Sequence, residues 1–112
     1  MAAAYSNLYI EQGATYSTTI TLDDVYGQLY DLSNYTAHSQ IRKSYYSSNA
    51  TATFSTSINI GNGTVTLNLD ANTTANIAPG RYVYDAIIVD SVHNVTTRIL
   101  EGIIDVSPAV TR

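Results

Sequence analysis

The chain has 112 residues, of which 45% are hydrophobic and only 12% charged, with a formal net charge of −4 and no cysteine. Such a length supports one domain with a core of its own, and no disulfide or thiolate metal ligand can contribute to it. The few scattered basic residues exclude a nucleic-acid surface, which needs a clustered positive field. Neither a membrane-spanning apolar stretch nor a secretory signal is evident, so we expect a soluble protein made in the cytoplasm.

Alternation of apolar and polar side chains with a period of two predicts about seven short strands. In chain order they are expected at 4–11, 15–23, 35–43, 51–59, 64–69, 81–90 and 95–106. An Asn-Gly pair, Asn62-Gly63, predicts a hairpin between the fourth and fifth strands. No segment keeps a 3.6-residue apolar period. The pattern therefore predicts an all-β protein with a single domain over residues 1–112.

The segment 66–85 has the order of elements found at one corner of immunoglobulin-like domains. A strand ends at Asp70, which can cap one helical turn, and Pro79-Gly80 then reverses the chain into a Tyr-x-Tyr strand. Immunoglobulin-like domains carry a tyrosine there whose hydroxyl bonds back to the crossover backbone. Tyr82 is expected to be that tyrosine, with Tyr84 at the position of an antibody-domain cysteine. We therefore expect an immunoglobulin-like antiparallel β-sandwich without a disulfide.

The last two predicted strands differ from the others because they are apolar on both faces. One face, which includes Tyr82, Tyr84 and Leu100, is expected to enter the core. An apolar outer face on a one-domain sandwich has nothing within the chain to cover it, which favours a partner. The residues predicted to form this partner-binding face are Val83, Ile87, Val89, Ile99 and Ile103.

Tyrosine supplies a second candidate contact. Tyr45-Tyr46 follows Arg42 and Lys43 in a serine-rich bend, and exposed tyrosine beside arginine and serine is typical of protein interfaces and sugar-binding loops. The tyrosines near strand ends are instead expected to fill the edges of the core: Tyr5, Tyr9, Tyr26 and Tyr30.

Residues for catalysis or metal binding do not form a recognisable pattern. His38 and His93 lie far apart and lack the neighbours of a metal motif. Three carboxylates, Asp85, Glu101 and Asp105, are predicted on the outer face of the last two strands. They could bind a metal or a glycan, but we favour a structural role, either protection of the sheet edge against aggregation or ion pairing with Arg81 and Arg98. We expect no enzymatic activity, no catalytic residue, no metal and no cofactor.

Four segments in sequence resemble a domain common in structural proteins of tailed bacteriophages: IEQGATYSTTITLDD, GQLYDLSNYTAHSQIRKS, LNLDANTTANIAPGRYVYDAII and TTRILEGIIDVSPAVTR. From Ile10 to Arg112, the chain is similar to the N-terminal domain of upper baseplate proteins of phages of Gram-positive bacteria, and to small virion proteins of cyanophages. The resemblance implies a virion component, made in the host cytoplasm, that docks on other virion proteins in several symmetric copies.

The resemblance leaves more than one role open. Longer members continue into a region that forms fibres or binds the host, whereas this sequence ends at Arg112, so we expect a structural or decorating role and not direct receptor binding. The first expectation is an adaptor associated with the tail or baseplate. A capsid decoration protein is an alternative within the virion. A carbohydrate-binding module for adhesion to the host surface is the other alternative, with Tyr45, Tyr46 and the three carboxylates lining its site.

Overall fold

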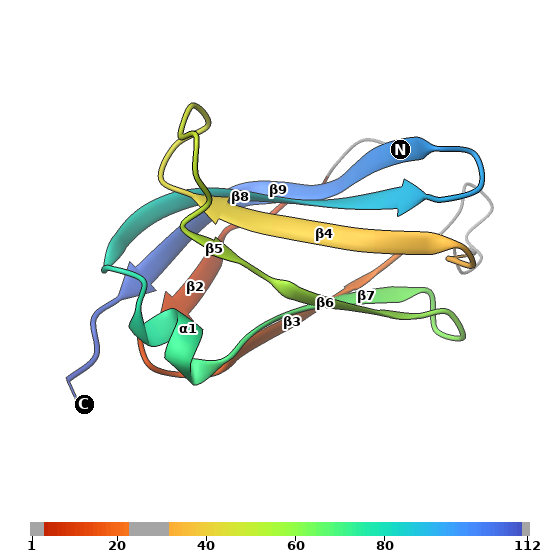
Figure 1. The fold of residues 1–112 in the computed structure, drawn as a ribbon. Helices are drawn as coiled ribbons and strands as arrows, with labels where there is room; N and C mark the ends of the chain where they lie inside the picture. The colour runs from red at the N-terminus through yellow and green to blue at the C-terminus, as the bar shows by residue number, and fades with distance from the viewer. Residues whose placement is uncertain (1–3, 23–31, 111–112) are drawn as a thin grey trace.

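Two β-sheets packed face to face form the protein in the computed structural model, which describes residues 4–22 and 32–110 (Figure 1). The first sheet has the order β1-β9-β8-β4-β5, with β2 also paired to β9, and the second has the order β3-β7-β6. The strands of the first sheet are β1 (Ala4–Tyr5), β2 (Leu8–Glu11), β4 (Tyr35–Arg42), β5 (Ala52–Thr53), β8 (Gly80–Asp90) and β9 (Val95–Ser107). Those of the second are β3 (Tyr16–Thr21), β6 (Ser55–Asn59) and β7 (Thr64–Leu69).

The strand order is that of an immunoglobulin-like sandwich, which confirms the predicted fold class. A sheet β3-β7-β6 facing a sheet that contains β4, β8 and β9 corresponds to the two layers of immunoglobulin-like domains, although β1 and β2 pair with β9 and not with β3, and β5 extends the same sheet. The predicted strands are all present, but 4–11 is divided into β1 and β2, and 51–59 into β5 and β6. One detail differs, because β1 and β2 run parallel to β9, so the first sheet is not wholly antiparallel.

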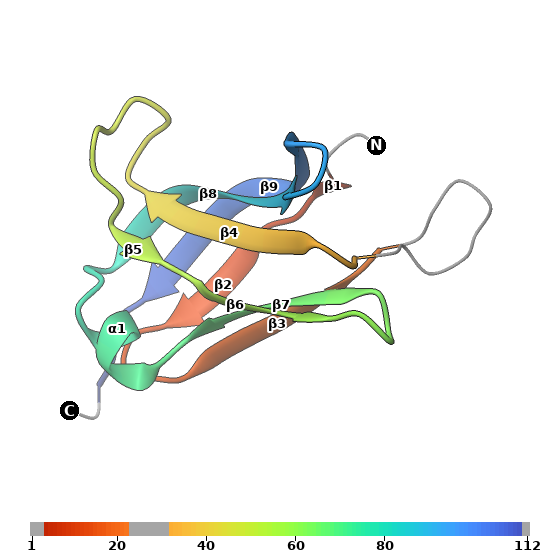
Figure 2. The same cartoon turned by 45° about the vertical axis from the view of Figure 1, so that its right-hand side comes forward.

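The division of 51–59 has a structural cause, since the strand passes from one sheet to the other (Figure 2). β5 pairs with β4, and β6 pairs with β7. At the crossing the Phe54 N–H donates to the Ser39 carbonyl at 3.0 Å, and Thr56 Oγ1 donates to the Ala37 carbonyl at 2.8 Å. These bonds hold β6 against β4 and close this side of the sandwich.

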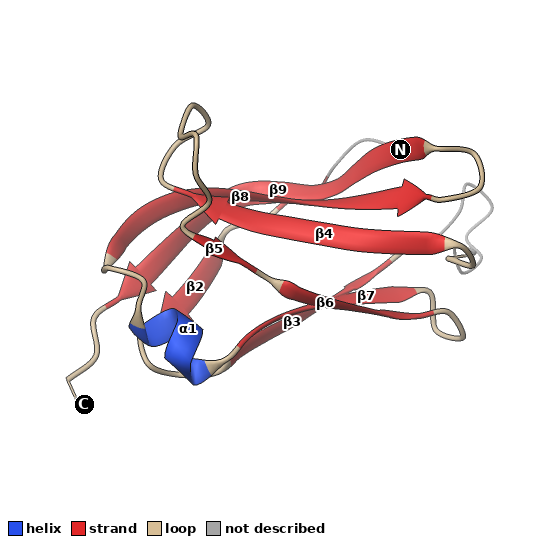
Figure 3. Ribbon diagram, viewed as in Figure 1, coloured by secondary structure: helices blue, strands red, loops and turns tan. Residues whose placement is uncertain are grey.

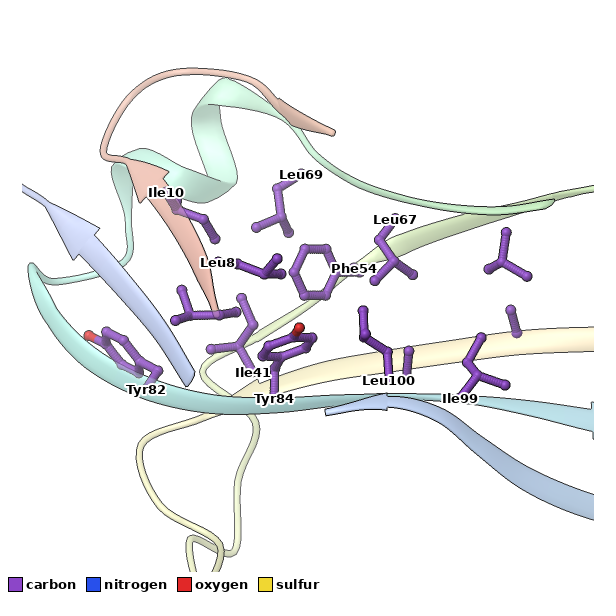
Figure 4. Close-up of a cluster of buried hydrophobic side chains, with 14 of the residues drawn as sticks. Leu8, Ile10, Ile41, Phe54, Leu67, Leu69, Tyr82, Tyr84, Ile99 and Leu100 are labelled. Atoms are coloured by element: carbon purple, nitrogen blue, oxygen red, sulfur yellow. The ribbon is translucent and has the colours of Figure 1, made fainter. Parts of the chain in front are cut away.

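The core lies between the sheets and is built from the inward residues of the alternating strands (Figure 4). Phe54 lies between Tyr16 and Tyr84, with ring centroids 6.3 and 6.4 Å away. Around these rings pack the buried aliphatic side chains of both sheets: Leu8, Ile10, Ile41, Val65, Leu67, Leu69, Ile88 and Ile104.

The corner between β7 and β8 matches its prediction. α1 (Ala71–Ala75), the helix in Figure 3, begins after Asp70, whose Oδ1 accepts a bond of 2.7 Å from the Thr73 N–H. Pro79-Gly80 then leads into β8, and the Tyr82 hydroxyl donates to the Ala78 carbonyl at 2.5 Å. This is the tyrosine-corner bond expected for the fold. Within the described residues no helix is long enough to cross a membrane.

The β6–β7 hairpin is also present where the Asn-Gly pair predicts it. Gly63 has a φ of +63°, which suits glycine, whereas Asn62 does not adopt a positive φ. The Asn62 N–H instead bonds to the Asn59 side chain at 3.2 Å.

Candidate functional site

The outer face of the β4-β8-β9 sheet carries the aliphatic residues expected to meet a partner. Val83 on β8 lies directly between Arg42 on β4 and Ile103 on β9. Two residues further along β8, on the same face, Asp85 lies between Gln40 on β4 and Glu101 on β9. Four of the five predicted aliphatic residues are half-buried on this face: Val83, Ile87, Val89 and Ile103.

Ile99 is the exception, and its predicted place on this face is wrong. Its side chain is only 3% exposed and belongs to the core (Figure 4). A β-bulge explains the difference, because Ala86 pairs with Leu100 while the next residue, Ile87, pairs with Arg98. Ile99 is the extra residue of the bulge, so Ile99 and Leu100 both point inward and the alternation of β9 shifts by one.

The sequence contains a signal for this bulge. With unbroken alternation, Arg98 would share the inward face with Leu100 and Ile104, and an unpaired arginine is too costly in a hydrophobic core. The shift places Arg98 on the outer face beside Ile87 instead. A charged residue in the inward register of a strand therefore indicated the bulge.

The three carboxylates of this face form ion pairs with two arginines. Arg98 Nε lies 3.4 Å from Asp85 Oδ2, and its Nη1 lies 3.2 Å from Glu101 Oε2. Arg81 Nε lies 3.1 Å from Asp105 Oδ1. These ion pairs confirm one of the two structural roles expected for the cluster. Their side chains are partly exposed, so each pair adds little stability, about 1 kcal/mol at most. Their main effect is to make the face nearly neutral.

A shallow depression of about 370 Å³ lies on this face beneath the β4–β5 connection. Its lining residues are Gln40, Arg42, Tyr45, Val83, Tyr84, Asp85, Arg98 and Glu101. Arg42 shapes one wall, because its Nη1 donates to the Ser47 carbonyl and its Nη2 to Gln40 Oε1, both at 2.8 Å. The connection stands away from the sheet in Figure 1, so its residues can reach a partner.

The exposed tyrosines lie at two borders of the same face. Tyr45 and Tyr46 are 72% and 96% exposed in the β4–β5 connection, and only Tyr45 lines the depression. Tyr5 and Tyr9, expected to fill core edges, are instead 60% and 70% exposed. They lie on the parallel strands β1 and β2, opposite Glu101 and Asp105.

The prediction for Tyr9 fails because Leu8 and Ile10 occupy the inward positions of β2, and the prediction for Tyr5 fails because both residues of β1 are exposed. The alternation of Leu8, Tyr9 and Ile10 in the sequence could have indicated that Tyr9 points outward. Tyr26 and Tyr30 lie outside the described residues.

The titratable groups of the described residues are mostly at turns and on outer faces. His93 Nδ1 lies 2.9 Å from Asp90 Oδ2, and this bond, with the N–H groups of Val92 and His93, lowers the pKa of the Asp90 carboxyl. His38 lies on the outer face opposite Ile87. Within residues 4–22 and 32–110, no three histidine or acidic side chains lie close enough together to hold a metal. What the face offers chemically is a half-buried aliphatic centre, neutralised charges and tyrosines at the border.

Comparison with known proteins supports the fold class. Neither a protein-family model nor a curated protein matches the chain. Of solved structures, 159 chains match, among them the crystal structure of InlP from Listeria monocytogenes, with a TM-score of 0.54 and 16% identity. The match covers 94% of this chain and 28% of that chain, so this chain corresponds to only part of that protein. The likeness agrees with an all-β sandwich and leaves its function open, because such folds serve many functions.

Proposed function

We propose that this chain is a non-enzymatic structural subunit of a bacteriophage virion, associated with the tail or baseplate, which docks on other virion proteins. The observation that carries the proposal is the outer face of β4, β8 and β9. Its half-buried aliphatic side chains lie among paired charges and exposed tyrosines. An apolar centre with a polar rim and tyrosine at its border is the composition of protein interfaces. The resemblance of the sequence to phage structural domains is the reason for proposing that the partners are virion proteins.

The docking face is tested by placing lysine at its centre. In the variant Ile87→Lys/Ile103→Lys the added charges lie on the half-buried outer face, so the chain folds but should lose its place in assembled particles. A matched control, Ser57→Lys/Thr66→Lys, adds the same charge to the outer face of the second sheet and should incorporate normally. Both variants are produced from the phage genome, and their occupancy is measured in purified virions.

Three outcomes would count against the proposal. Full occupancy by the Ile87/Ile103 variant refutes the docking face, and absence of the wild-type chain from purified virions refutes the virion role. Immunogold labelling on the head, with a copy number close to that of the major capsid protein, favours capsid decoration over the tail or baseplate.

Carbohydrate binding remains a second candidate because of the depression beside Tyr45. An exposed tyrosine above Gln40, Asp85 and Glu101 combines a stacking surface with hydrogen-bonding groups, as sugar sites do. Host polysaccharide is titrated while tyrosine fluorescence is followed, with Tyr45→Ala as the site variant and Tyr9→Ala as an equally exposed control. Saturable binding that only Tyr45→Ala abolishes favours adhesion, and no binding removes this candidate.

A further inference from the structure

The free edge of β3 in the second sheet has no partner among the described residues. β3 pairs only with β7, and β7 pairs on its other side with β6. The other strand at the edge of this sheet, β6, is held against β4 through Thr56 and the Phe54 N–H. The sandwich is thus closed on the β4–β6 side, whereas among residues 4–22 and 32–110 no strand covers the edge of β3 on the opposite side.

β3 also lacks the features by which proteins protect exposed edges. Those features are charged side chains, proline, bulges and very short strands. The six residues Tyr16–Thr21 include no charge, proline or glycine, and their ladder with β7 is regular. By contrast, the edges of the first sheet are blunted, because β5 has two residues and the β1–β2 edge is interrupted and carries Glu11.

The backbone of β3 is oriented for further pairing. The Leu22 N–H donates to the Gly63 carbonyl at 2.9 Å, so Leu22 is in phase with the hydrogen-bonded pairs of the β3–β7 ladder. In an antiparallel ladder such pairs alternate with pairs whose N–H and C=O groups point away. In register with Leu22, the residues that turn these groups toward the free edge are Ser17, Thr19 and Thr21.

We infer that β3 pairs antiparallel with β3 of a second copy of this chain, with Thr19 opposite Thr19 on a two-fold axis. This register also places Ser17 opposite Thr21 of the other copy, so all three available residues are used and about six main-chain hydrogen bonds form. The product is one continuous sheet with three strands from each copy.

Charge and burial point to a second copy as the occupant. The chain carries a net charge of −4, so two copies repel each other over most approaches. β3, β6 and β7 contain no charged residue, so no charge on these three strands opposes an approach at this edge. Tyr16 and Ile20 remain half-buried although they point toward the core. In the inferred register the Thr18 and Ile20 side chains of the two copies become neighbours, which covers more of this apolar surface.

The association uses the edge rather than the outer face of this sheet. That face consists of hydroxyl and amide side chains, with Ser17 Oγ bonded to Asn68 Oδ1 at 2.8 Å and the Thr19 and Thr66 hydroxyls 3.2 Å apart. Such a polar face gains little from being covered, whereas the unpaired main-chain groups of β3 gain partners. The inference is independent of the docking face proposed above, which belongs to the other sheet.

The inference is tested by placing a charge at Thr19, on the two-fold axis, and measuring the dimerisation of the purified chain by sedimentation. Wild-type protein should dimerise within a series reaching about 1 mM, the weak end of specific association. Thr19→Lys and Thr19→Glu each place like charges directly opposite one another and should weaken the dimer about tenfold or more. An equimolar mixture of the two variants should restore it. Ser57→Lys, equally exposed in the same row of the sheet, is the matched control and should leave the dimer unchanged.

Spin labels locate the interface directly, because the chain has no cysteine of its own. Labels at Thr19→Cys should couple strongly, since the two backbones lie about 5.5 Å apart in a hydrogen-bonded pair. Labels at Ser57→Cys lie five strand spacings apart, or about 24 Å. A chain that stays monomeric at the highest concentration overturns the inference, even if it captures a strand of another protein. So does a dimer that Thr19→Lys leaves intact, a mixture that fails to restore pairing, or weak coupling at Thr19.

Discussion

The phenolic hydroxyl of Tyr84 donates a hydrogen bond of 2.6 Å to the main-chain carbonyl of Ser6, a residue 78 positions earlier in the chain. Ser6 lies between β1 and β2, so the bond fastens the first segment of the chain to the central strand β8. Gly102, directly opposite Tyr84 on β9, leaves the space into which the Ser6 carbonyl fits. Antibody domains join their two sheets by a disulfide, whereas this bond joins β8 to a segment at the edge of its own sheet.

Stability at alkaline pH should depend on Tyr84. Burial of the phenol, with a smaller contribution from Tyr16, raises the pKa of Tyr84 from 10.0 to about 12. The unfolded chain therefore releases this proton first, and the free energy of unfolding falls as pH rises from about 10 to about 12. Urea midpoints of wild type and Tyr84→Phe are compared across this range. The variant should be less stable at pH 8, by about 1 kcal/mol, and should lose less stability on the way to pH 12. Parallel curves would contradict the prediction.

Gly102→Ala should destabilise the chain strongly. A Cβ at Gly102 would lie 2.0 Å from the Ser6 carbonyl oxygen, which is main chain and cannot rotate away. We expect a loss of about 1–3 kcal/mol from overpacking, with β1 and β2 displaced from β9. Gly61→Ala is the control, since its Cβ would meet only Asn59 Oδ1 at an ordinary 3.5 Å. Thermal unfolding of the two variants checks the contrast, and equal melting temperatures would refute it.

Tyr82→Phe should remove the corner bond and leave the ring in place. The Ala78 carbonyl then loses its donor, so the free energy of unfolding should fall by about 1 kcal/mol. Tyr46→Phe, at a side chain 96% exposed, serves as the control and should leave stability unchanged within about 0.5 kcal/mol. Chemical denaturation measures both. An unchanged midpoint for Tyr82→Phe would mean that the corner bond does not stabilise the fold.

The bulge in β9 predicts opposite results at two isoleucines. Ile99→Lys would place a charge in the core and should cost about 3 kcal/mol or more, or prevent folding. Ile103→Lys lies on the half-buried outer face and should cost about 1 kcal/mol. Circular dichroism and urea unfolding distinguish the two variants. A tolerated Ile99→Lys would show that the side chain faces outward, as simple alternation predicts.

Local patterns in the sequence were sufficient to predict most strands, the helical turn and the tyrosine corner. Asp70 caps α1, Gly63 adopts the positive φ of the hairpin, and Tyr82 bonds to Ala78, all as predicted. These features involve residues a few positions apart, so the signals that specify them are complete within a short segment.

The candidate face was predicted less completely, because its composition depends on pairing between distant strands. Val83, Ile87, Val89 and Ile103 follow from alternation within one strand. The inward turn of Ile99 required the bulge opposite β8. The exposure of Tyr5 and Tyr9 required the parallel pairing of β1 and β2 with β9.

By itself, then, the sequence determined an all-β chain, the limits of most strands, the cap at Asp70 and the tyrosine corner. The tertiary structure alone decided the order of strands in the two sheets, the bond from Tyr84 to Ser6 and the open edge of β3. The physical reason is that alternation records which side of a strand meets the core, but carries no record of which strand lies beside it. Neighbours are selected when whole faces pack together, and among the described residues that selection leaves the edge of β3 unpaired while β6 is held against β4.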